Sequence, residues 1–326
     1  MSDTSNLLIL PRLRIQNANA ISSPMTWGFP AMSAFIGFIH ALERKLPEEI
    51  DLEFKSIGVI CHQYQAQTTQ DFVHRFNLTR NPVDKAGKSA AIVEEGRIHL
   101  EVTLVLSVEG DACLGEKADR DQVANEVAKI ASGMRIAGGS LIPETSGKSR
   151  SKPELIPLSE DSEEKHKQFR RLKMRWLPGF ALVLRNDLLH AHHEKLAADN
   201  SKSTLLDAWL DLSRLNIECH QTEVTDEKGN TEQEVSWQTR RAPGWIVPIP
   251  VGYGALSPLY EAGSVANTRD NSTPFRFVES LYSVGQWISP HRLQSIDNML
   301  WYVDNDLDSG LYRLNSDFRT AAAITD

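Results

Sequence analysis

The sequence predicts an α+β protein, for two reasons. First, apolar runs and helically spaced apolar residues follow one another over residues 7–142 in the order strand, helix, strand, strand, helix, strand. This is the order of ferredoxin-like or RRM-like folds. Second, the pattern becomes mainly helical over 144–236 and rich in strands and turns over 237–326. We therefore expect an RRM-like domain over 1–143, a mainly helical insertion, and a β- and loop-rich C-terminal region that packs back on the first domain.

The elements of the first region follow from their residue patterns. A continuous apolar run indicates a buried strand, whereas apolar residues three or four positions apart indicate one face of a helix. In chain order, these patterns predict a strand over 7–15, a helix containing Phe35 to Leu42 that ends near Pro47, a strand over 51–64, a strand over 98–108, a helix over 122–134, and a short strand before Gly138 and Gly139. Segment 65–90 contains few aliphatic residues, which predicts a long hairpin or loop.

A polar stretch, Gln16 to Thr26, separates the first strand from the first helix. Its side chains are amides, hydroxyls and small groups, and Trp27 follows directly. A polar loop held between two rigid elements is typical of a ligand-binding site. Serine and asparagine are also common turn and cap residues, so an ordinary strand-to-helix connection is an equally good interpretation.

The second half of the chain contains two strongly charged stretches. Within eleven residues without any acid lie Lys165, Lys167, Arg170, Arg171, Lys173 and Arg175. A basic helix is often only a solvated face, but in an acidic protein it also favours contact with phosphate or with an acidic partner surface. Residues 218–234 are acidic around Lys228-Gly229-Asn230, which predicts an exposed loop or the tip of a hairpin.

Composition limits the class of protein. Hydrophobic residues make up 41% of the chain and charged residues 24%, which is typical of a globular protein with a sizeable core. No run approaches the roughly 18 apolar residues that a membrane span needs, and the N-terminus has no basic segment, so we expect a cytoplasmic protein. A net charge of −8 argues against a free, nonspecific nucleic-acid binder but leaves room for a confined basic site.

Cysteine and histidine patterns predict no metal and no cofactor. The three cysteines are far apart and form no Cys-x-x-Cys pair. His190, His192 and His193 lie close together, but only Glu194 accompanies them, which is a poor match to zinc ligand patterns.

Seven blocks of sequence carry a resemblance to a known family. They are residues 16–30 with Gln-Asn-Ala-Asn-Ala-Ile-Ser-Ser-Pro and Thr-Trp-Gly-Phe-Pro, then 76–82, 91–97, 134–140, 177–183, 248–260 and 289–292. In the same order along the chain, these blocks resemble the Csy-two family, the Cas-five-like subunit of type I-F CRISPR surveillance complexes. The resemblance spans nearly the whole sequence.

The resemblance implies a fold, a function and a set of partners. The fold would be of the RAMP type, which is built on RRM-like domains. The chain would be a non-catalytic subunit of an antiviral ribonucleoprotein. It would hold the 5′ handle of the CRISPR RNA, pair with the large Csy subunit at the tail of the complex, and contact the backbone Csy subunit. Target specificity would come from pairing with the guide, while this end of the complex would lie close to double-stranded target DNA near the target-adjacent motif.

The residues expected to contact RNA are those that supply hydrogen-bond donors, a glycine that lets the backbone approach the ligand closely, or an aromatic ring for stacking. The candidates are Asn17, Asn19, Ser22, Ser23, Trp27, Arg80, Asn81, Arg97, Arg135, Gly138, Gly139, Arg276, His291 and Arg292. The basic stretch from Lys165 to Arg175 is expected to contact target DNA or a partner. Two alternatives remain open at this point: Trp27 could pack in the core, and Arg97 could simply pair with a neighbouring glutamate.

Two other functions compete with RNA binding. The first is cleavage of CRISPR transcripts by a RAMP endoribonuclease, in which His40 would act as general acid or base. His40 follows Phe38 and Ile39 in an apolar helix, however, and no nucleophile elbow, Walker loop or metalloprotease motif is present. The second alternative is a scaffold that contacts only protein partners. An RNA-free scaffold would tolerate alanine throughout residues 16–27.

Overall fold

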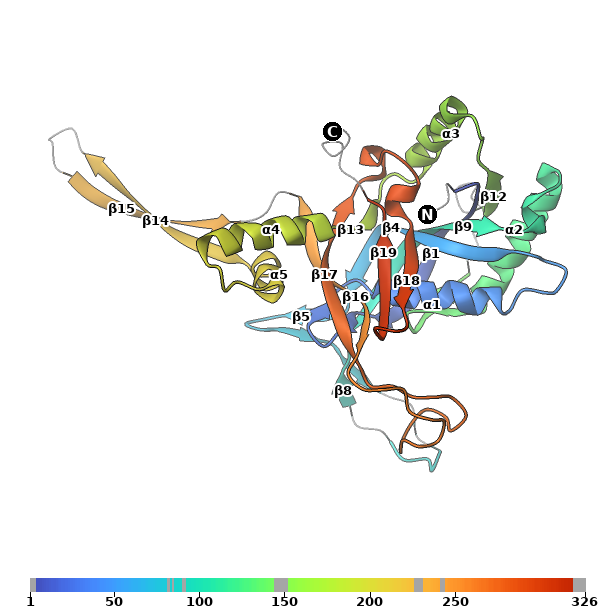
Figure 1. Ribbon diagram of the computed structural model, residues 1–326, viewed down its shortest axis with the longest axis horizontal. Helices are drawn as coiled ribbons and strands as arrows, with labels where there is room; N and C mark the ends of the chain where they lie inside the picture. Colours follow the sequence, from blue (N-terminus) through green and yellow to red (C-terminus); the bar gives the residue numbers. More distant parts are fainter. Residues whose placement is uncertain are drawn as a thin grey trace.

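In the computed structural model, the described residues are 4–80, 83, 85–89, 92–143, 152–225, 231–240 and 244–318. These residues form a mixed α and β structure dominated by a large antiparallel sheet (Figure 1). The predicted α+β class is therefore confirmed. None of the described helices is both long enough and apolar enough to cross a bilayer.

The first part of the sheet contains the strands expected from residues 7–142. The elements are β1 (Asn6–Asn19), β2 (Ile21–Ser23), β3 (Thr26–Trp27), α1 (Met32–Glu43), β4 (Glu53–Ala66), β9 (Arg97–Glu109), α2 (Lys117–Ser132), β10 (Arg135–Ile136) and β11 (Gly139–Ile142). Their order across the sheet is β10-β11-β1-β9-β4, and every neighbouring pair is antiparallel. A short turn, η1 (Asp111–Cys113), precedes α2.

The sheet continues with strands from the second half of the chain. These are β12 (Glu154–Pro157), β13 (Phe180–Leu184), β16 (Trp245–Ala255), β17 (Val278–Ile288), β18 (Trp301–Asp306) and β19 (Leu311–Ser316). The order beyond β4 is β13-β17-β16-β19-β18, and β12 pairs with β1. Trp301 in β18 also pairs with Ile57 in β4. The strands from β4 to β18 therefore close into a ring.

Helices cover both faces of the sheet, because the central strands are apolar on both sides. Along β1, Leu8 and Leu10 belong to the main core under α1, while Leu7 and Ile9 face the second core, which contains apolar residues of α3 (Ser162–Arg175). Side chains alternate between the faces of a strand, so a strand buried on both faces requires the continuous apolar run seen in the sequence. The turns η3 (Pro290–Arg292) and η4 (Asp297–Met299) lie on the α3 side.

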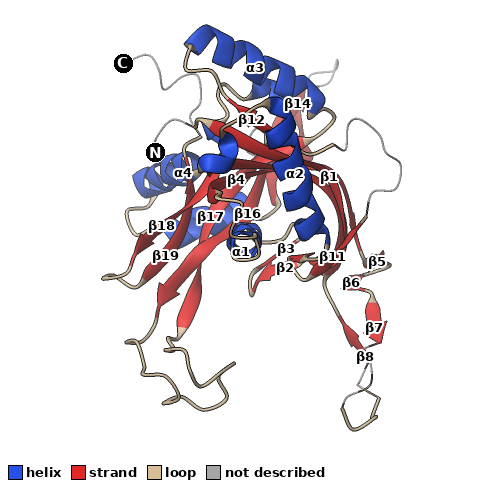
Figure 2. Cartoon of the chain, turned by 90° about the vertical axis from the view of Figure 1, so that its right-hand side faces the viewer, coloured by secondary structure: helices blue, strands red, loops and turns tan. Residues whose placement is uncertain are grey.

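Two protrusions leave the body. Four short strands, β5 (Thr68–Gln70), β6 (His74–Phe76), β7 (Leu78–Arg80) and β8 (Ile92–Glu94), form two small hairpins within segment 65–96. In both views β7 and β8 lie at the opposite end of the molecule from α3 (Figure 2). The other protrusion follows α4 (Asn186–Asp199) and α5 (Leu205–Ser213) and consists of β14 (Asn216–Thr225) and β15 (Thr231–Arg240).

The polar stretch after the first strand differs from the expected loop. Strand β1 continues to Asn19, and β2 and β3 then form a tight hairpin. Register shifts accompany left-handed backbone at Arg12 (φ 53°) and Asn17 (φ 56°), so β1 bends where its sequence becomes polar. The three-region division remains a prediction. Region 144–236 contributes α3, α4 and α5, but its strands β12 and β13 belong to the main sheet.

Candidate functional site

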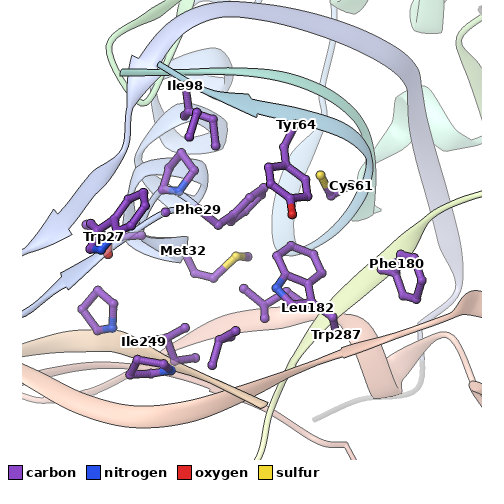
Figure 3. A pocket seen from close by; sticks show the side chains of 18 of the residues that line it. Trp27, Phe29, Met32, Cys61, Tyr64, Ile98, Phe180, Leu182, Ile249 and Trp287 are labelled. Carbon is purple, nitrogen blue, oxygen red and sulfur yellow. The ribbon is translucent and has the colours of Figure 1, made fainter. Parts of the chain in front are cut away.

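An apolar cavity of about 370 Å³, here called the aromatic pocket, opens among the strands of the main sheet and α1. Figure 3 shows its side chains converging from several strands. Its aromatic lining consists of Trp27, Phe29, Tyr64, Phe180, Trp245 and Trp287. Apolar side chains complete the lining, among them Met32, Leu182 and Ile249.

Local packing holds the rings in place. Gly28 adopts a φ of 120°, a conformation that L side chains rarely adopt, and so allows the chain to turn between Trp27 and Phe29. The Phe29 ring lies edge-on to Trp287, with 4.9 Å between ring centroids. Trp245 in turn lies 6.0 Å from Trp287. Aromatic contacts therefore join the segment between β3 and α1, through Phe29, to β16 and β17.

Four of the rings are substantially exposed, which is unusual for such large apolar groups. The exposed fractions are 57% for Trp27, 61% for Tyr64, 44% for Trp245 and 41% for Phe180. The alternative that Trp27 packs in the core is therefore excluded. Its only ring contact among the described residues is edge-on with Phe76 at 5.5 Å. Exposed rings around a cavity provide flat surfaces on which a planar group can stack.

The histidine of the pocket is hydrogen-bonded through both ring nitrogens. His62 Nδ1–H donates to the Pro178 carbonyl at 2.6 Å, and its Nε2 accepts from the Thr103 hydroxyl at 2.8 Å. Burial lowers the pKa of His62, which favours the neutral ring. Burial also raises the pKa of the neighbouring Cys61 thiol to about 12, so it remains protonated. The pocket is thus suited to binding by stacking and contains no activated nucleophile.

A second depression of about 680 Å³, here called the tyrosine groove, adjoins the pocket. Ser22, Pro30 and Ala31 line both. Gly138, Tyr253 and Tyr312 are among the residues that line the groove. The ring centroids of the two tyrosines are 6.2 Å apart. Burial raises the pKa of Tyr312.

The two predicted glycines of this region have different roles. Gly138 has a φ of 77°, and a Cβ placed there would meet nothing within 4 Å, so its backbone faces open space. Gly139 is buried, and a Cβ placed there would lie 2.7 Å from the Ala18 backbone nitrogen. Gly138 is therefore available to a ligand, whereas Gly139 is required for packing of β11 against β1.

Several predicted donors of the polar stretch are used locally. The Asn19 side chain donates to the Ile21 carbonyl at 2.8 Å and accepts from the Ile21 amide at 3.0 Å. The hydroxyls of Ser22 and Ser23 each lie 2.7 Å from the Thr26 hydroxyl. These side chains hold the β2–β3 hairpin. Asn17, in contrast, is exposed, and no hydrogen bond of its amide side chain to another described residue is present.

The predicted arginines near this end of the molecule lie in different environments. Arg97 forms an ion pair with Glu95, as one of the two alternatives anticipated. Arg135, in β10, is exposed and has no ion pair within the described part of the chain. Strand β7 ends at Arg80, but its side chain and the whole of Asn81 lie outside the described residues.

The remaining RNA-contact candidates are not brought to the pocket. His291 and Arg292 are exposed in η3, which packs beside α3, and the His291 ring lies 2.8 Å from the Ser289 hydroxyl. Arg276 is half-buried, with its guanidinium beside Gly310. The structure therefore groups His291 and Arg292 with the basic helix rather than with Trp27.

The basic residues of α3 form two groups: some hydrogen-bond to the rest of the protein, and the others are exposed. Lys165 donates to the Thr4 carbonyl at 2.9 Å, and Lys173 donates to the Leu293 carbonyl at 2.8 Å. Arg175 forms two hydrogen bonds with Glu154, at 2.7 and 2.8 Å. The outward residues are Lys167, Arg170 and Arg171, of which Lys167 lies 3.6 Å from Glu164. Half of the basic stretch thus attaches α3 to the body, and the other half forms an exposed basic face.

Sequence reasoning missed a polar groove of about 470 Å³ on the sheet itself. It contains Arg14, Gln63, Tyr64, Gln65 and His99. Gln63 and Gln65 pair with Glu101 and His99, whereas Tyr64 between them pairs with Leu100 of the core under α1, so the polar side chains of the groove lie on the opposite face of the sheet. The signal was present in the sequence, because the two glutamines alternate with Tyr64 and so indicate a polar face of this strand.

The histidine cluster forms no metal site. His192 Nε2 lies 2.7 Å from an Asp211 carboxylate oxygen, and His193 contacts the Ser203 carbonyl at 3.0 Å. Within the described ranges no group of three or more histidine, cysteine or carboxylate side chains is arranged to hold a metal ion.

Together, fold and site define a mixed α/β protein whose antiparallel sheet carries an aromatic pocket between two grooves. A family model described as CRISPR-associated protein (Cas_Csy2) matches residues 8–314. The CRISPR-associated protein Csy2 of Pseudomonas aeruginosa (strain UCBPP-PA14) is 48% identical over 317 residues, which cover 96% of each chain. The chain therefore belongs to the Csy-two (Csy2) family of CRISPR-associated proteins, as the sequence blocks predicted.

Proposed function

We propose that this chain is the non-catalytic subunit that binds the 5′ handle of the CRISPR RNA in a type I-F surveillance complex. The observation that carries the proposal is the aromatic pocket, where four exposed rings surround one cavity. Proteins hold single-stranded RNA largely by stacking unpaired bases on such rings, at about 1–3 kcal/mol for each base. An unpaired handle is therefore a suitable ligand.

The surroundings of the pocket support a path for several nucleotides. The tyrosine groove adds two rings and the open backbone at Gly138. On its other side, the polar groove adds Arg14 and amide side chains, which can bind phosphate and ribose hydroxyls. Tyr64 lines both the aromatic pocket and the polar groove. The three depressions can thus accept consecutive nucleotides of one strand.

We also propose that residues 6–142 are a RAMP-type ferredoxin-like domain. The strand order β11-β1-β9-β4, antiparallel throughout and with α1 and α2 as the two connecting helices, supports this assignment. The polar groove lies on the sheet face opposite α1, and sheets of RRM type bind RNA through exposed residues on one sheet face.

The basic face of α3, together with His291 and Arg292, is proposed to contact phosphates of target DNA or an acidic partner surface. Lys167, Arg170 and Arg171 point away from the body, and a cationic face of this kind attracts phosphate. The proposed protein partners are the large Csy subunit and the backbone Csy subunit.

We propose that the chain does not cleave RNA. His40, the candidate general acid or base, is exposed on α1, and its ring has no hydrogen-bond partner within the described part of the chain. General acid–base catalysis needs such a histidine to be oriented beside a second group.

Site-specific crosslinking tests the proposal. The chain is assembled with the other Csy subunits and a CRISPR transcript that carries one photoreactive base at each handle position in turn. We expect crosslinks from the handle to Trp27, Tyr64 or Trp245. An assembled complex in which the handle crosslinks only to other subunits would instead support a protein-only scaffold. Loss of transcript cleavage on His40→Ala, with RNA binding retained, would support the nuclease.

A further inference from the structure

Strands β14 and β15 form a two-stranded ribbon that stands apart from the main sheet. They pair in register from Asn216–Arg240 to Thr225–Thr231. Figure 1 shows the ribbon projecting beyond α4 and α5, away from α3. Ten residues of strand extend about 33 Å. Because an isolated two-stranded ribbon is only marginally stable in water, one of this length is expected to gain stability from a partner.

The base of the ribbon is fixed by a buried carboxylate. Asp211, at the end of α5, contacts His192 of α4 at 2.7 Å, Arg214 at 2.7 Å and Arg240 of β15 at 3.3 Å. Arg240 also contacts Glu218 of β14 at 2.5 Å. These contacts join both ribbon strands to both helices, so the ribbon leaves the body in a defined direction rather than as a free tether.

The two faces of the ribbon differ in character. Directly paired residues lie on the same face, so Ile217, Val235 and Trp237 share one face, on which they are 56%, 51% and 69% exposed. The opposite face carries the ion-paired Glu218 and Arg240 with His220 and Gln238 between or beside them. Cys219, Gln221 and Thr239 share the face with these three residues, so the half of the ribbon nearest the body carries an exposed apolar cluster, and this side is here called the apolar face. Such a cluster is typical of a surface that is covered in an assembly.

Charge identifies the kind of partner. Residues 186–240 contain eleven acidic and five basic residues, a net charge of −6 out of −8 for the whole chain. Such a segment repels the phosphates of RNA and DNA. It fits a protein surface on which basic side chains flank an apolar groove, because charge complementarity at the rim and apolar burial at the centre are how protein interfaces are built.

We propose that the apolar face of the β14–β15 ribbon docks on another protein subunit of the Csy complex, at an apolar groove flanked by lysine or arginine. The ribbon and the aromatic pocket then have separate tasks: the pocket binds a stacking ligand, and the ribbon fixes the chain to a neighbouring protein. This inference rests on membership of the family and does not require that the pocket binds RNA.

The test measures binding of this chain to each purified Csy subunit, one at a time, by biolayer interferometry. The test variant is Ile217→Ser with Trp237→Ser on the apolar face. The matched control is His220→Ser with Gln238→Ser on the opposite face. We expect one subunit to bind the unaltered chain, and its Kd to rise roughly thirtyfold or more in the test variant, the usual cost of losing a central tryptophan. The control should change Kd by less than about threefold.

Two further readouts separate the possible outcomes. Raising the salt concentration should weaken binding of the unaltered chain, because screening reduces attraction between the acidic ribbon and a basic rim. Retention of guide RNA by the test variant is measured in parallel. Equal binding of the test variant and the unaltered chain to every subunit would overturn the proposal. So would a test variant that loses guide RNA while it binds all subunits normally, since the ribbon would then be a nucleic-acid arm.

Discussion

Replacing Trp27 by alanine tests the aromatic pocket without disturbing the fold. Trp27 is 57% exposed and has one edge-on ring contact, with Phe76. Truncation therefore removes only a small buried apolar area, which corresponds to about 1 kcal/mol of folding stability. If a handle base stacks on the indole, the loss in binding free energy is about 1–3 kcal/mol, or roughly a five- to 150-fold increase in Kd.

The assay is fluorescence anisotropy with a labelled handle oligonucleotide, with this chain bound to its partner subunits. Phe72→Ala provides the matched control, because Phe72 is a fully exposed aromatic residue of the neighbouring segment and lies outside the pocket. We expect Phe72→Ala to leave the Kd within about twofold. Equal Kd values for Trp27→Ala and the unaltered chain, in a complex that assembles normally, would refute stacking at this ring.

Three other perturbations follow from the structure. Burial alone would raise the pKa of Asp211, but hydrogen bonds from its histidine and arginine partners lower it overall. The stabilisation from the Asp211 carboxylate is then present above the ordinary aspartate pKa near 4 and is lost as pH falls through the lowered pKa. Asp211→Asn at neutral pH, and acid in the unaltered chain, should therefore both reduce the protection factors of the ribbon amides, which compare each exchange rate with the intrinsic rate at the same pH; unchanged protection factors in either case would contradict this role. Gly139→Ala places a Cβ against the backbone of β1 and should cost about 1–3 kcal/mol in urea unfolding, whereas Gly37→Ala, exposed on α1 with free space around it, should be neutral or stabilising. Charge reversal of Arg170 and Arg171 should weaken target-DNA binding and reduce its salt dependence if α3 contacts phosphate, and an unchanged salt slope in electrophoretic mobility assays would exclude that contact.

Sequence patterns predicted the elements of the first region well, because its central strands are buried on both faces. A continuous run such as Leu7 to Leu10 has no other simple explanation than a strand between two cores. The extent of β1 was harder to predict. Its last residues are polar because they lie at the edge of the grooves, and polar residues in a strand resemble a loop.

The candidate site could be predicted only in part, because its rings come from distant segments. Trp27 was a candidate, but Trp245 and Trp287 reach the same pocket only through the pairing of β16 and β17, which local patterns do not specify. Conversely, the sequence predicts Ser22 and Ser23 as ligand donors, although in the structure these serines before Pro24 form a turn with Thr26. Hydroxyls close to a proline are often used by the turn itself.

The ring of strands closes where β18 pairs with β4, and these two strands are synthesised far apart in time. Trp301 is fully buried, pairs with Ile57, and donates its indole N–H to the Leu182 carbonyl at 2.8 Å. Pairing residues so distant in sequence closes a long loop of chain, which slows folding. Strand β4 acquires its neighbour β18 only after Trp301 has been synthesised. The pocket wall built from β16 and β17 is likewise completed late, so an interrupted translation product would lack both the wall and the closed ring.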